Sequence, residues 1–396
     1  MTGSTVNELT LVRATPYDIN PAVPRTLAAA RDVFDRASVL CWNHKGLSRP
    51  RSEVLDGVLI RRLNFRLGGS RVRALIGMPL YLTWVLVHLL HRRPRVVQAF
   101  DFYSMIPAIV ARWLTGCQVI YDMRDPLADS FTLFVRFPML RRLVHGMDWM
   151  AMGFATAFVV PDESRVGYLG RWGRLKPVGV IRNTCHDELA AVEGSEEFRS
   201  LPPSGGAVRV ALLGYVVATR GANELLEAVE GAETGAELWV AGACSPPRLA
   251  DRFEAAPNAT WWGKCPWRKS LALTRAADLV AILYDPVIPV NRIAAPNKLY
   301  ESLMLGTPVL VSRGMELGEW VEREGLGFVV DYGNVQVIRD VFRRLEDPAE
   351  RRRIGRRCRE YFLRHCTLSA ELDTYRRYYR RRLRISETNA KAPRDR

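Results

Sequence analysis

The residues best suited to chemistry lie in the segment 295–312, APNKLYESLMLGTPVLVS. A proline precedes Asn297 at the start of a predicted helix, Lys298 and Glu301 stand on its first turn, and Gly306 ends it. The unpaired amides of such a helix start form a natural anion site that suits phosphate. Lys298 would offset phosphate charge and Glu301 would accept hydrogen bonds from ribose hydroxyls. The alternative is an ordinary helix-to-strand unit in which Glu301 is merely solvated.

This segment resembles the donor site of family 4 glycosyltransferases, many of which carry a Pro-x-Lys-x-x-Glu helix followed by small-Gly-x-Pro-Val. These enzymes use nucleotide-sugars and have the two-domain GT-B architecture. The resemblance implies that Asn297, Lys298, Leu299 and Glu301 bind the sugar donor. The family usually has a further glutamate eight residues earlier, where this chain has Ile293. Recognition of the donor sugar by that carboxylate is therefore in doubt.

A second donor element is the turn 213–221, LGYVVATRG. Gly214 directly follows a predicted buried strand, so a ligand can approach the backbone there, and Arg220 would reach a diphosphate from the loop. The turn looks like the family's Gly-Arg-x-x-x-x-Lys-Gly segment, with Tyr215 at the arginine position and Arg220 at the lysine position. The alternative is a surface arginine in a turn.

A third element is the segment 261–266, WWGKCP, which resembles the family's strand-Gly loop that receives the nucleotide base. Gly263 would line the base site, and Lys264 is a weaker phosphate ligand. Trp262 or Trp267 would stack on the base, although a buried strand tryptophan explains Trp262 equally well.

In the first half, Asp101 ends the segment VQAFD, which resembles a strand end at the interdomain cleft with Phe100 in place of the family's histidine. Asp101 would hydrogen-bond an acceptor hydroxyl. Asp122 and Arg124 follow the next strand, and a carboxylate beside an arginine at a strand's carboxyl end suits substrate contact. We take these three as catalytic candidates, against the alternative that Asp122, Arg124 and Asp125 only cap a helix.

Metal and cofactor motifs are absent from the sequence. There is no Asp-x-Asp pair, HExxH, GxSxG or P-loop, so no motif in the sequence supports metal-dependent transfer, hydrolysis or kinase chemistry. We expect no cofactor and no metal. Helix amides and basic side chains would stabilise the departing diphosphate instead.

Short apolar runs alternate with amphipathic stretches along the chain, which is typical of βαβ units and parallel sheets. The first half predicts strands at 9–12, 38–42, 96–99, 118–121, 157–160 and 178–181, and helices near 23–34, 71–91, 104–114, 138–152 and 163–172. The second half predicts strands at 208–213, 237–240, 260–262, 279–283, 309–311 and 328–330, a helix at 223–230 and a helical tail from 335.

The predicted fold class is α/β, with two Rossmann-like domains facing a central cleft as in GT-B enzymes. We expect an acceptor domain over 1–195 and a donor domain over 206–367, joined by the Glu-, Pro- and Gly-rich segment that begins near 195. A terminal helix at 368–383 would pack back on the first domain, and 385–396 would be disordered.

Composition gives further limits. The chain has 396 residues, 48% of them hydrophobic, and seven cysteines without a CxxC pair, which indicates a reduced, cytoplasmic protein. The start, MTGSTVNELTLV, lacks a basic region followed by an apolar core, so we expect no signal peptide. The net charge is +15, and residues 339–384 contain 16 arginines against seven acidic residues. No nucleic-acid module accompanies that charge, so nucleic acid is not an expected partner.

Two apolar stretches bear on membranes. Residues 74–90 lack charged side chains and have arginines on both sides, and 131–158 mixes arginines with large apolar residues. A spanning helix is one interpretation of 74–90, and an interfacial or buried helix is the other. Together the stretches predict peripheral attachment to an anionic membrane, at the inner face of the plasma membrane.

The predicted function is transfer of a sugar from a nucleotide-diphosphate-sugar to a glycan or lipid-linked glycan, with retention of configuration implied by the family. Two alternatives stay open. One is a catalytically impaired subunit that binds a glycan or a partner protein, because Ile293, Tyr215 and Phe100 replace expected polar groups. The other is a nucleotide-sugar epimerase of the same architecture.

Overall fold

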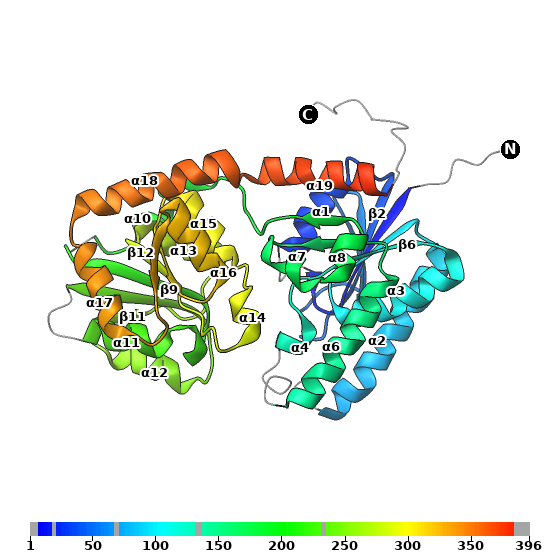
Figure 1. Ribbon diagram of the computed structural model, residues 1–396, viewed down its shortest axis with the longest axis horizontal. Coiled ribbons are helices and arrows are strands. Elements are labelled where there is room, and N and C mark those ends of the chain that lie inside the picture. Colours follow the sequence, from blue (N-terminus) through cyan, green and yellow to red (C-terminus); the bar gives the residue numbers. More distant parts are fainter. Residues whose placement is uncertain are drawn as a thin grey trace. The chain divides into compact units, whose positions relative to one another are not determined.

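The computed structural model describes residues 7–17, 21–66, 71–130, 137–203, 205–230 and 235–383. The chain divides into two compact units: unit 1 comprises 1–182 and 371–396, and unit 2 comprises 183–370 (Figure 1). Residues 183–203 were expected to end the first domain and enter the linker, but they belong to unit 2. The segment expected to be disordered, 385–396, lies outside the described residues.

In its described part, unit 1 contains an eight-stranded sheet with the order β3-β4-β2-β1-β5-β6-β7-β8. Its neighbours are parallel except for the antiparallel β3–β4 hairpin. The strands are β1 (Glu8–Arg13), β2 (Arg36–Trp42), β3 (Ser52–Leu55), β4 (Val58–Leu63), β5 (Val96–Ala99), β6 (Gln118–Asp122), β7 (Ala157–Val160) and β8 (Val178–Val180).

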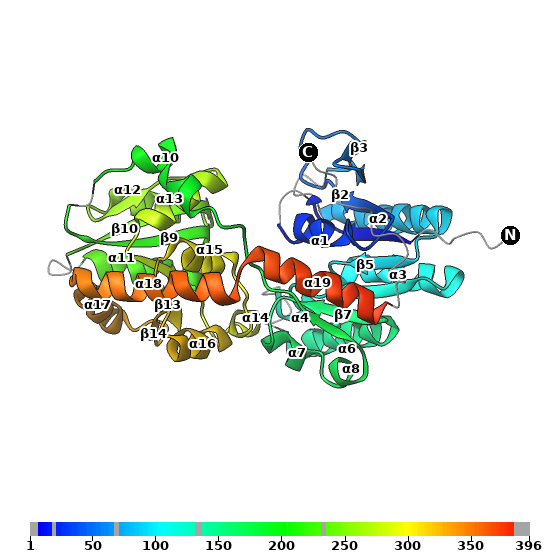
Figure 2. The ribbon, with the colours of Figure 1, turned by 90° about the horizontal axis from the view of Figure 1, so that it is seen from above.

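Helices cover both faces of this sheet. They are α1 (Ala22–Ala30), α2 (Arg71–Arg92), α3 (Phe102–Thr115), α4 (Leu127–Ser130), α6 (Pro138–Phe154), α7 (Ser164–Tyr168), α8 (Arg171–Leu175) and α19 (Leu368–Arg382). Alternation along β1 shows the two layers: Leu9 and Leu11 pack with α1 and α19, whereas Val12 packs with α2 and α3. Figures 1 and 2 both show α2, α3 and α6 side by side.

Helix α19 is held to unit 1 by its tyrosines. Tyr379 donates a hydrogen bond to Gln98 on β5 over 2.6 Å, and Gln98 donates to Tyr375 over 2.5 Å. Tyr378 donates to the carbonyl of Phe158 on β7 over 2.8 Å. These buried hydroxyls find partners on the strands because a buried polar group without one is costly.

In unit 2, the described strands form a six-stranded parallel sheet with the order β11-β10-β9-β12-β13-β14. They are β9 (Val208–Val216), β10 (Ala236–Cys244), β11 (Ala259–Trp261), β12 (Leu279–Ile282), β13 (Val309–Ser312) and β14 (Gly327–Val330). The helices are α9 (Leu189–Glu193), α10 (Glu196–Arg199), the 3₁₀ turn η2 (Ala218–Arg220), α11 (Ala222–Glu230), α12 (Arg248–Ala255), α13 (Trp267–Ala276), α14 (Pro289–Arg292), α15 (Asn297–Leu305), α16 (Glu316–Glu324), α17 (Val335–Arg344) and α18 (Pro348–His365). Both units are Rossmann-like.

The predicted strands are all present, with ends shifted by at most a few residues. The predicted helix at 163–172 is wrong as a single element, because the chain turns at Gly170 with a positive φ of 54° and forms α7 and α8. The helical tail is likewise three helices, since Pro348 starts α18 anew. Among the described helices, none combines the length and the apolar character that crossing a bilayer requires.

Candidate functional site

The sheet of unit 2 defines where a ligand would bind. In chain order its strands run 3-2-1-4-5-6, so the direction of the connections reverses between β9 and β12. Ligands of open parallel sheets bind at the carboxyl ends of the strands beside such a reversal. The turn after β9, the loop after β12 and the start of α15 all belong to this edge, which brings the predicted donor segments to one end of unit 2.

Three glycines lie side by side at the carboxyl ends of β9, β10 and β11. Gly214 pairs in register with Gly242, and the amide of Gly242 donates to the carbonyl of Gly263 over 2.9 Å. Gly214 has a φ of 117° and open space where a side chain would begin, so its exposed backbone is accessible to a ligand. A Cβ on Gly242 would lie 1.7 Å from the carbonyl oxygen of Gly214. Sequence analysis missed Gly242, although a glycine near a strand end is the same signal that identified Gly214.

Arg220 lies on η2, and its guanidinium carbon is 4.5 Å from the ring centre of Tyr284 and 5.6 Å from that of Tyr215. Tyr284 follows β12, so the arginine bridges the loops of the two strands at the reversal. No ion pair joins Arg220 to a carboxylate within the described part of the chain. A half-buried arginine held by aromatic faces retains its donors for an anion.

The start of α15 has the predicted form. The helix begins after Pro296 with no side chain capping its amides, and it ends at Gly306 in the left-handed conformation with a φ of 70°. Helix geometry leaves the amides of Asn297 and Lys298 without an acceptor inside the helix. The side-chain oxygen of Asn297 is buried without a partner among the described residues.

Leu299 does not fit its predicted role. Its side chain is 1% exposed in the core of unit 2, and its amide donates to the carbonyl of Pro296 over 3.2 Å. The side chain serves packing, and the amide is already used.

Lys298 and Glu301 form a closed cluster with α13. The ammonium of Lys298 bonds to one carboxylate oxygen of Glu301 and, over 2.9 Å, to the hydroxyl of Ser270. The indole of Trp267 donates to the other carboxylate oxygen over 2.9 Å. Glu301 is 7% exposed, so this cluster shields it from solvent. Sequence analysis placed Trp267 near the base but did not predict its bond to Glu301, and it missed Ser270.

The pairing of Lys298 with Glu301 changes the electrostatics of the predicted site. Their charges cancel locally, so a bound diphosphate would be neutralised by the amides of α15 and by Arg220 more than by Lys298. Each carboxylate oxygen has two lone pairs, so Glu301 keeps acceptor capacity for a ribose hydroxyl once a ligand displaces part of the cluster.

The segment after β11 gives a mixed result. Lys264 is exposed next to Gly263. Trp262 is half-buried, lies edge-on to Trp239 at 5.6 Å, and has the ammonium of Lys269 at 4.8 Å from its ring centre. These contacts give Trp262 a packing role and leave Trp267, which is 47% exposed, as the ring better placed for a base.

In unit 1, Asp101 sits where the strand order reverses between β1 and β5. One of its oxygens accepts from the amide of Ser104 over 2.8 Å and caps α3, and the other accepts from the amide of Ala14 over 2.9 Å. Burial raises the pKa of this carboxyl, and the two amide bonds oppose that rise. The carboxylate thus already ties two loops together.

Asp122 and Arg124 form a buried pair at the end of β6. The guanidinium of Arg124 lies 2.6 Å from one carboxylate oxygen, and Gln98 donates to the other over 2.7 Å. Asp122 is fully buried, and Tyr375 of α19 donates to it over 3.4 Å. The predicted substrate contact has no support in this geometry, because the carboxylate faces internal partners only.

Sequence analysis missed Arg13, the last residue of β1. The guanidinium carbons of Arg13 and Arg124 each lie 5.9 Å from the ring centre of Phe100. One terminal nitrogen of Arg13 is buried without a partner in the described structure, and burial lowers the pKa of this arginine. Because Arg124 is already paired with Asp122, Arg13 is the arginine that makes this edge of unit 1 suited to an anionic group.

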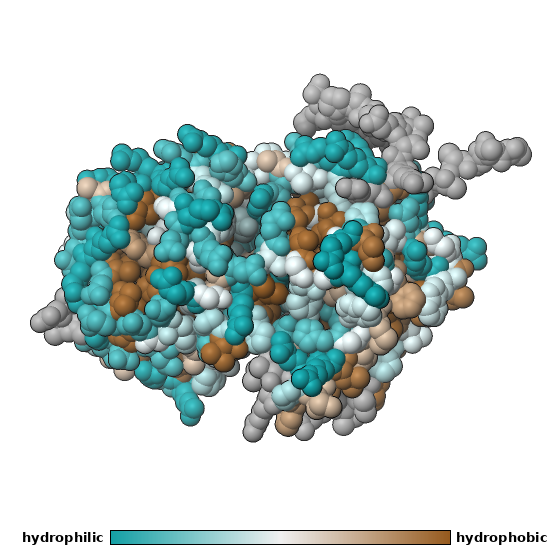
Figure 3. Space-filling model, in the orientation of Figure 1, coloured by the Kyte–Doolittle hydropathy of each residue, from teal (hydrophilic) through white to brown (hydrophobic). Residues whose placement is uncertain are grey.

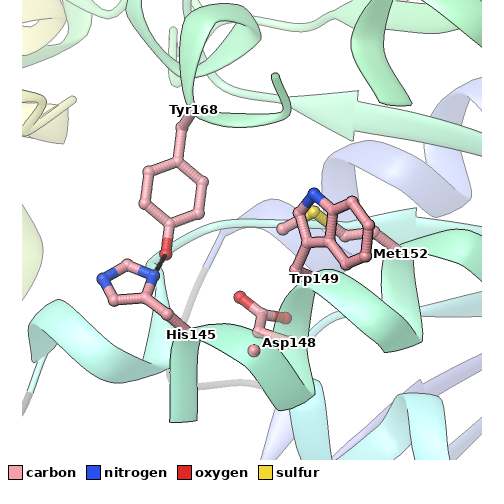
Figure 4. A pocket seen from close by; sticks show the side chains of 6 residues that line it. His145, Asp148, Trp149, Met152 and Tyr168 are labelled. Atoms are coloured by element: carbon pink, nitrogen blue, oxygen red, sulfur yellow. Dashed lines mark hydrogen bonds between the residues drawn. The ribbon is translucent and has the colours of Figure 1, made fainter. Parts of the chain in front are cut away.

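Unit 1 also contains a pocket of about 400 Å³ that the predictions did not include (Figure 4). Tyr168, bonded to His145 over 2.9 Å, faces Trp149 and Met152 across it, and the carboxylate of Asp148 lies between them. Burial raises the pKa of Asp148 to about 6. The hydroxyl of Tyr121 donates to one of its oxygens over 2.9 Å, and the other has no partner among the described residues.

A second pocket, of about 420 Å³, lies in unit 2 beside Gly306 and α18, away from the start of α15. Among the described residues, no group of three or more His, Cys, Asp or Glu side chains is arranged to hold a metal. All seven cysteines are free thiols.

Comparison with known proteins gives a structural result only. No family model and no curated protein matches the sequence. Sucrose-phosphate synthase from Thermosynechococcus elongatus superposes with a TM-score of 0.74 over 96% of this chain and 100% of that chain, at 16% identity. The chain has the GT-B fold.

Two further solved structures share this fold. HepE of Anabaena, in complex with UDP-glucose, gives a TM-score of 0.66 over 93% of this chain and 98% of its own, at 14% identity. A protein described as a UDP-N-acetylglucosamine 2-epimerase from Listeria monocytogenes gives 0.55 over 89% and 91%, also at 14% identity. The fold therefore accommodates both transferases and epimerases, and the side chains of this chain must decide between them.

Proposed function

We propose that this protein is a glycosyltransferase of the family 4 type that takes a sugar from a nucleotide-diphosphate-sugar and transfers it to a glycan or lipid-linked glycan. The observation that carries the proposal is the anion site at the strand reversal of unit 2. There the uncapped start of α15, the open backbone of Gly214 and the guanidinium of Arg220, which has no ion pair among the described residues, belong to one sheet edge. The presence of UDP-glucose in the HepE complex supports a sugar nucleotide as the ligand of this fold.

The proposed chemistry follows from charge. An acceptor hydroxyl attacks the anomeric carbon, the bond from that carbon to the diphosphate oxygen breaks, and the departing diphosphate keeps the electron pair and takes up the hydroxyl proton. The amides of Asn297 and Lys298 and the guanidinium of Arg220 stabilise that growing negative charge. Retention of anomeric configuration and independence from metals are carried over from the family resemblance.

The acceptor would use unit 1. Arg13 beside Phe100, with one buried terminal nitrogen that lacks a partner in the described structure, suits an acceptor that carries an anionic group, such as the phosphate of a lipid-linked glycan. We propose that the enzyme works in the cytoplasm at the inner face of the plasma membrane, where such acceptors are presented.

A catalytically impaired binding subunit is the second candidate, because both oxygens of Glu301 already have protein partners. Donor calorimetry on the wild type and on Glu301→Ala separates the cases. An enzyme binds a sugar nucleotide and loses affinity in the variant, whereas an impaired subunit binds none.

The proposal is tested by measuring thermal stabilisation with a panel of UDP-, GDP- and dTDP-sugars, followed by turnover with membrane extract as acceptor. We expect one nucleotide series to raise the melting temperature and its sugar to be transferred. Conversion of the donor to its epimer without acceptor would identify an epimerase instead. The absence of stabilisation by every nucleotide would contradict an active transferase.

A further inference from the structure

Helix α6 presents an apolar stripe to solvent. Met139, Leu143, Met147, Met150 and Phe154 follow one another at steps of four, four, three and four residues, so they share one face of the helix. Each is between 40% and 76% exposed. The opposite face, with Asp148 and Met152, packs into the unit. A helix of a soluble domain normally places polar side chains on its outer face, and α6 does the reverse.

The stripe continues across the neighbouring helices. Trp113 of α3, 67% exposed, meets Phe154 edge-on with ring centres 5.3 Å apart. Among the described residues, 13 of the 21 exposed large hydrophobic side chains lie on α2, α3 and α6 or at the residue before α6. In Figure 3, brown and tan surface gathers in the lower part of unit 1, over the region where these helices run. We call the outer surface of α2, α3 and α6 the apolar face.

The apolar face exposes no carboxylate of its own helices in the described structure. The sequences of its three helices contain six arginines, no lysine and a single acidic residue, Asp148. Asp148 is 1% exposed, so these helices present no carboxylate to solvent in their described part. Exposed Arg142 lies next to the stripe, one position before Leu143.

Helix α8 adds an aromatic and basic rim. The rings of Trp149 and Trp172 lie 5.3 Å apart, and the guanidinium carbon of Arg171 is 4.2 Å and 4.5 Å from their centres. Arg174 and Leu175 are exposed beside them. Tryptophan and arginine at the edge of an apolar surface suit the boundary between lipid headgroups and acyl chains.

A second copy of the chain fits this face poorly. A two-fold dimer would place the same surface on both sides, and its described helices offer exposed Arg142 but no exposed carboxylate to pair with it. Arg92 and Arg141 of this face already pair with Glu8 and Asp129 of unit 1, whereas exposed Arg142 has no ion pair among the described residues.

We propose that the apolar face docks on an anionic lipid bilayer, with the side chains of α6 and α3 entering the headgroup layer and the arginines meeting lipid phosphates. This inference rests on the proposed function in one respect: it gives the surface by which the enzyme would reach a lipid-linked acceptor. Each arginine brought to the surface would strengthen binding roughly fivefold, because such a contact contributes about 1 kcal/mol.

The test is flotation of the full chain with vesicles of phosphatidylcholine alone and with 30 mol% phosphatidylglycerol, without any sugar nucleotide. Two variants probe the face: Leu143→Glu with Met150→Glu, and Arg142→Gln. Leu363→Glu on α18 is the matched control, because Leu363 is an exposed helical leucine of unit 2. Arg377→Gln with Arg381→Gln probes the C-terminal arginines.

We expect binding to the anionic vesicles, a loss of tenfold or more in Leu143→Glu/Met150→Glu, a severalfold loss in Arg142→Gln, and wild-type binding in the control. Equal binding of all variants, loss only in Arg377→Gln/Arg381→Gln, or no binding to either vesicle would overturn the proposal. So would a dimer that Leu143→Glu/Met150→Glu dissociates, because a second copy would then cover the face. Nucleotide-induced stabilisation is measured separately on the same variants. A failure of vesicle binding would therefore not contradict the proposed donor site, and a failure of nucleotide binding would not contradict the membrane surface.

Discussion

Replacing Arg220 with methionine is the most selective perturbation of the proposed donor site. Among the described residues, aromatic rings are what hold this side chain, with its guanidinium carbon 4.5 Å from the centre of Tyr284. Losing that contact would lower the free energy of unfolding by about 0.5–1 kcal/mol. Losing a charge-assisted hydrogen bond to the diphosphate would weaken binding by about 1.5–3 kcal/mol, or about 10- to 150-fold.

Calorimetry with the nucleoside diphosphate and with the corresponding nucleoside would check this prediction. The loss should appear with the diphosphate and disappear with the nucleoside, because Arg220 is assigned to the phosphates alone. Arg352→Met, at an exposed arginine of α18, is the control and should bind both ligands like the wild type. Unchanged diphosphate affinity in a folded Arg220→Met protein, or an equal loss for the nucleoside, would refute the assignment.

Three further predictions concern the buried ionic groups. Lys298→Met and Glu301→Gln should each lower the free energy of unfolding, measured by urea unfolding, by about 2–3 kcal/mol. The double variant should lose less free energy of unfolding than the sum of the two single losses. Strict additivity would show that the pair is not coupled. Asp148→Asn should raise the melting temperature at pH 7.5 but not below pH 4. The pKa of Asp148 in the folded state, about 6, exceeds its ordinary value of 3.8, so the folded state binds the proton more tightly than the unfolded state does. The free energy of unfolding of the wild type therefore falls by roughly 3 kcal/mol as the pH rises between these two values. An equal shift at both pH values would contradict this sign. Asp122→Asn should lower the free energy of unfolding by about 3–5 kcal/mol, because Arg124 would keep a buried charge without its carboxylate; a fully stable variant that loses only turnover would restore the catalytic interpretation.

The positions of most strands along the chain could be predicted because buried parallel strands appear as short apolar runs. The run at 157–160, for example, matches β7 residue for residue. The β3–β4 hairpin was missed, although its signal is present: Asp56 and Gly57, both with positive φ, make the two-residue turn that such hairpins favour. The boundary between the units was predicted at 195, but unit 2 begins at Asn183. Helices α9 and α10 pack on α13 of unit 2, and composition does not reveal that packing.

The candidate site was predicted in part. The uncapped start of α15 follows from local sequence, because a helix start after proline is a property of a few consecutive residues, and anion binding there stays a prediction. The bond from Trp267 to Glu301 joins residues 34 positions apart on different helices, and no local pattern encodes it. The same holds for Asp122, whose burial depends on Tyr375 of α19, more than 250 residues away.

The most direct measurement is a crystal structure of the protein soaked with the sugar nucleotide that stabilises it best. The predicted result is a diphosphate within hydrogen-bond distance of the amides of Asn297 and Lys298, with the guanidinium of Arg220 turned toward it and Glu301 on the ribose. A nucleotide bound elsewhere, with the cluster of Lys298, Glu301 and Trp267 still closed over an unoccupied helix start, would contradict the account.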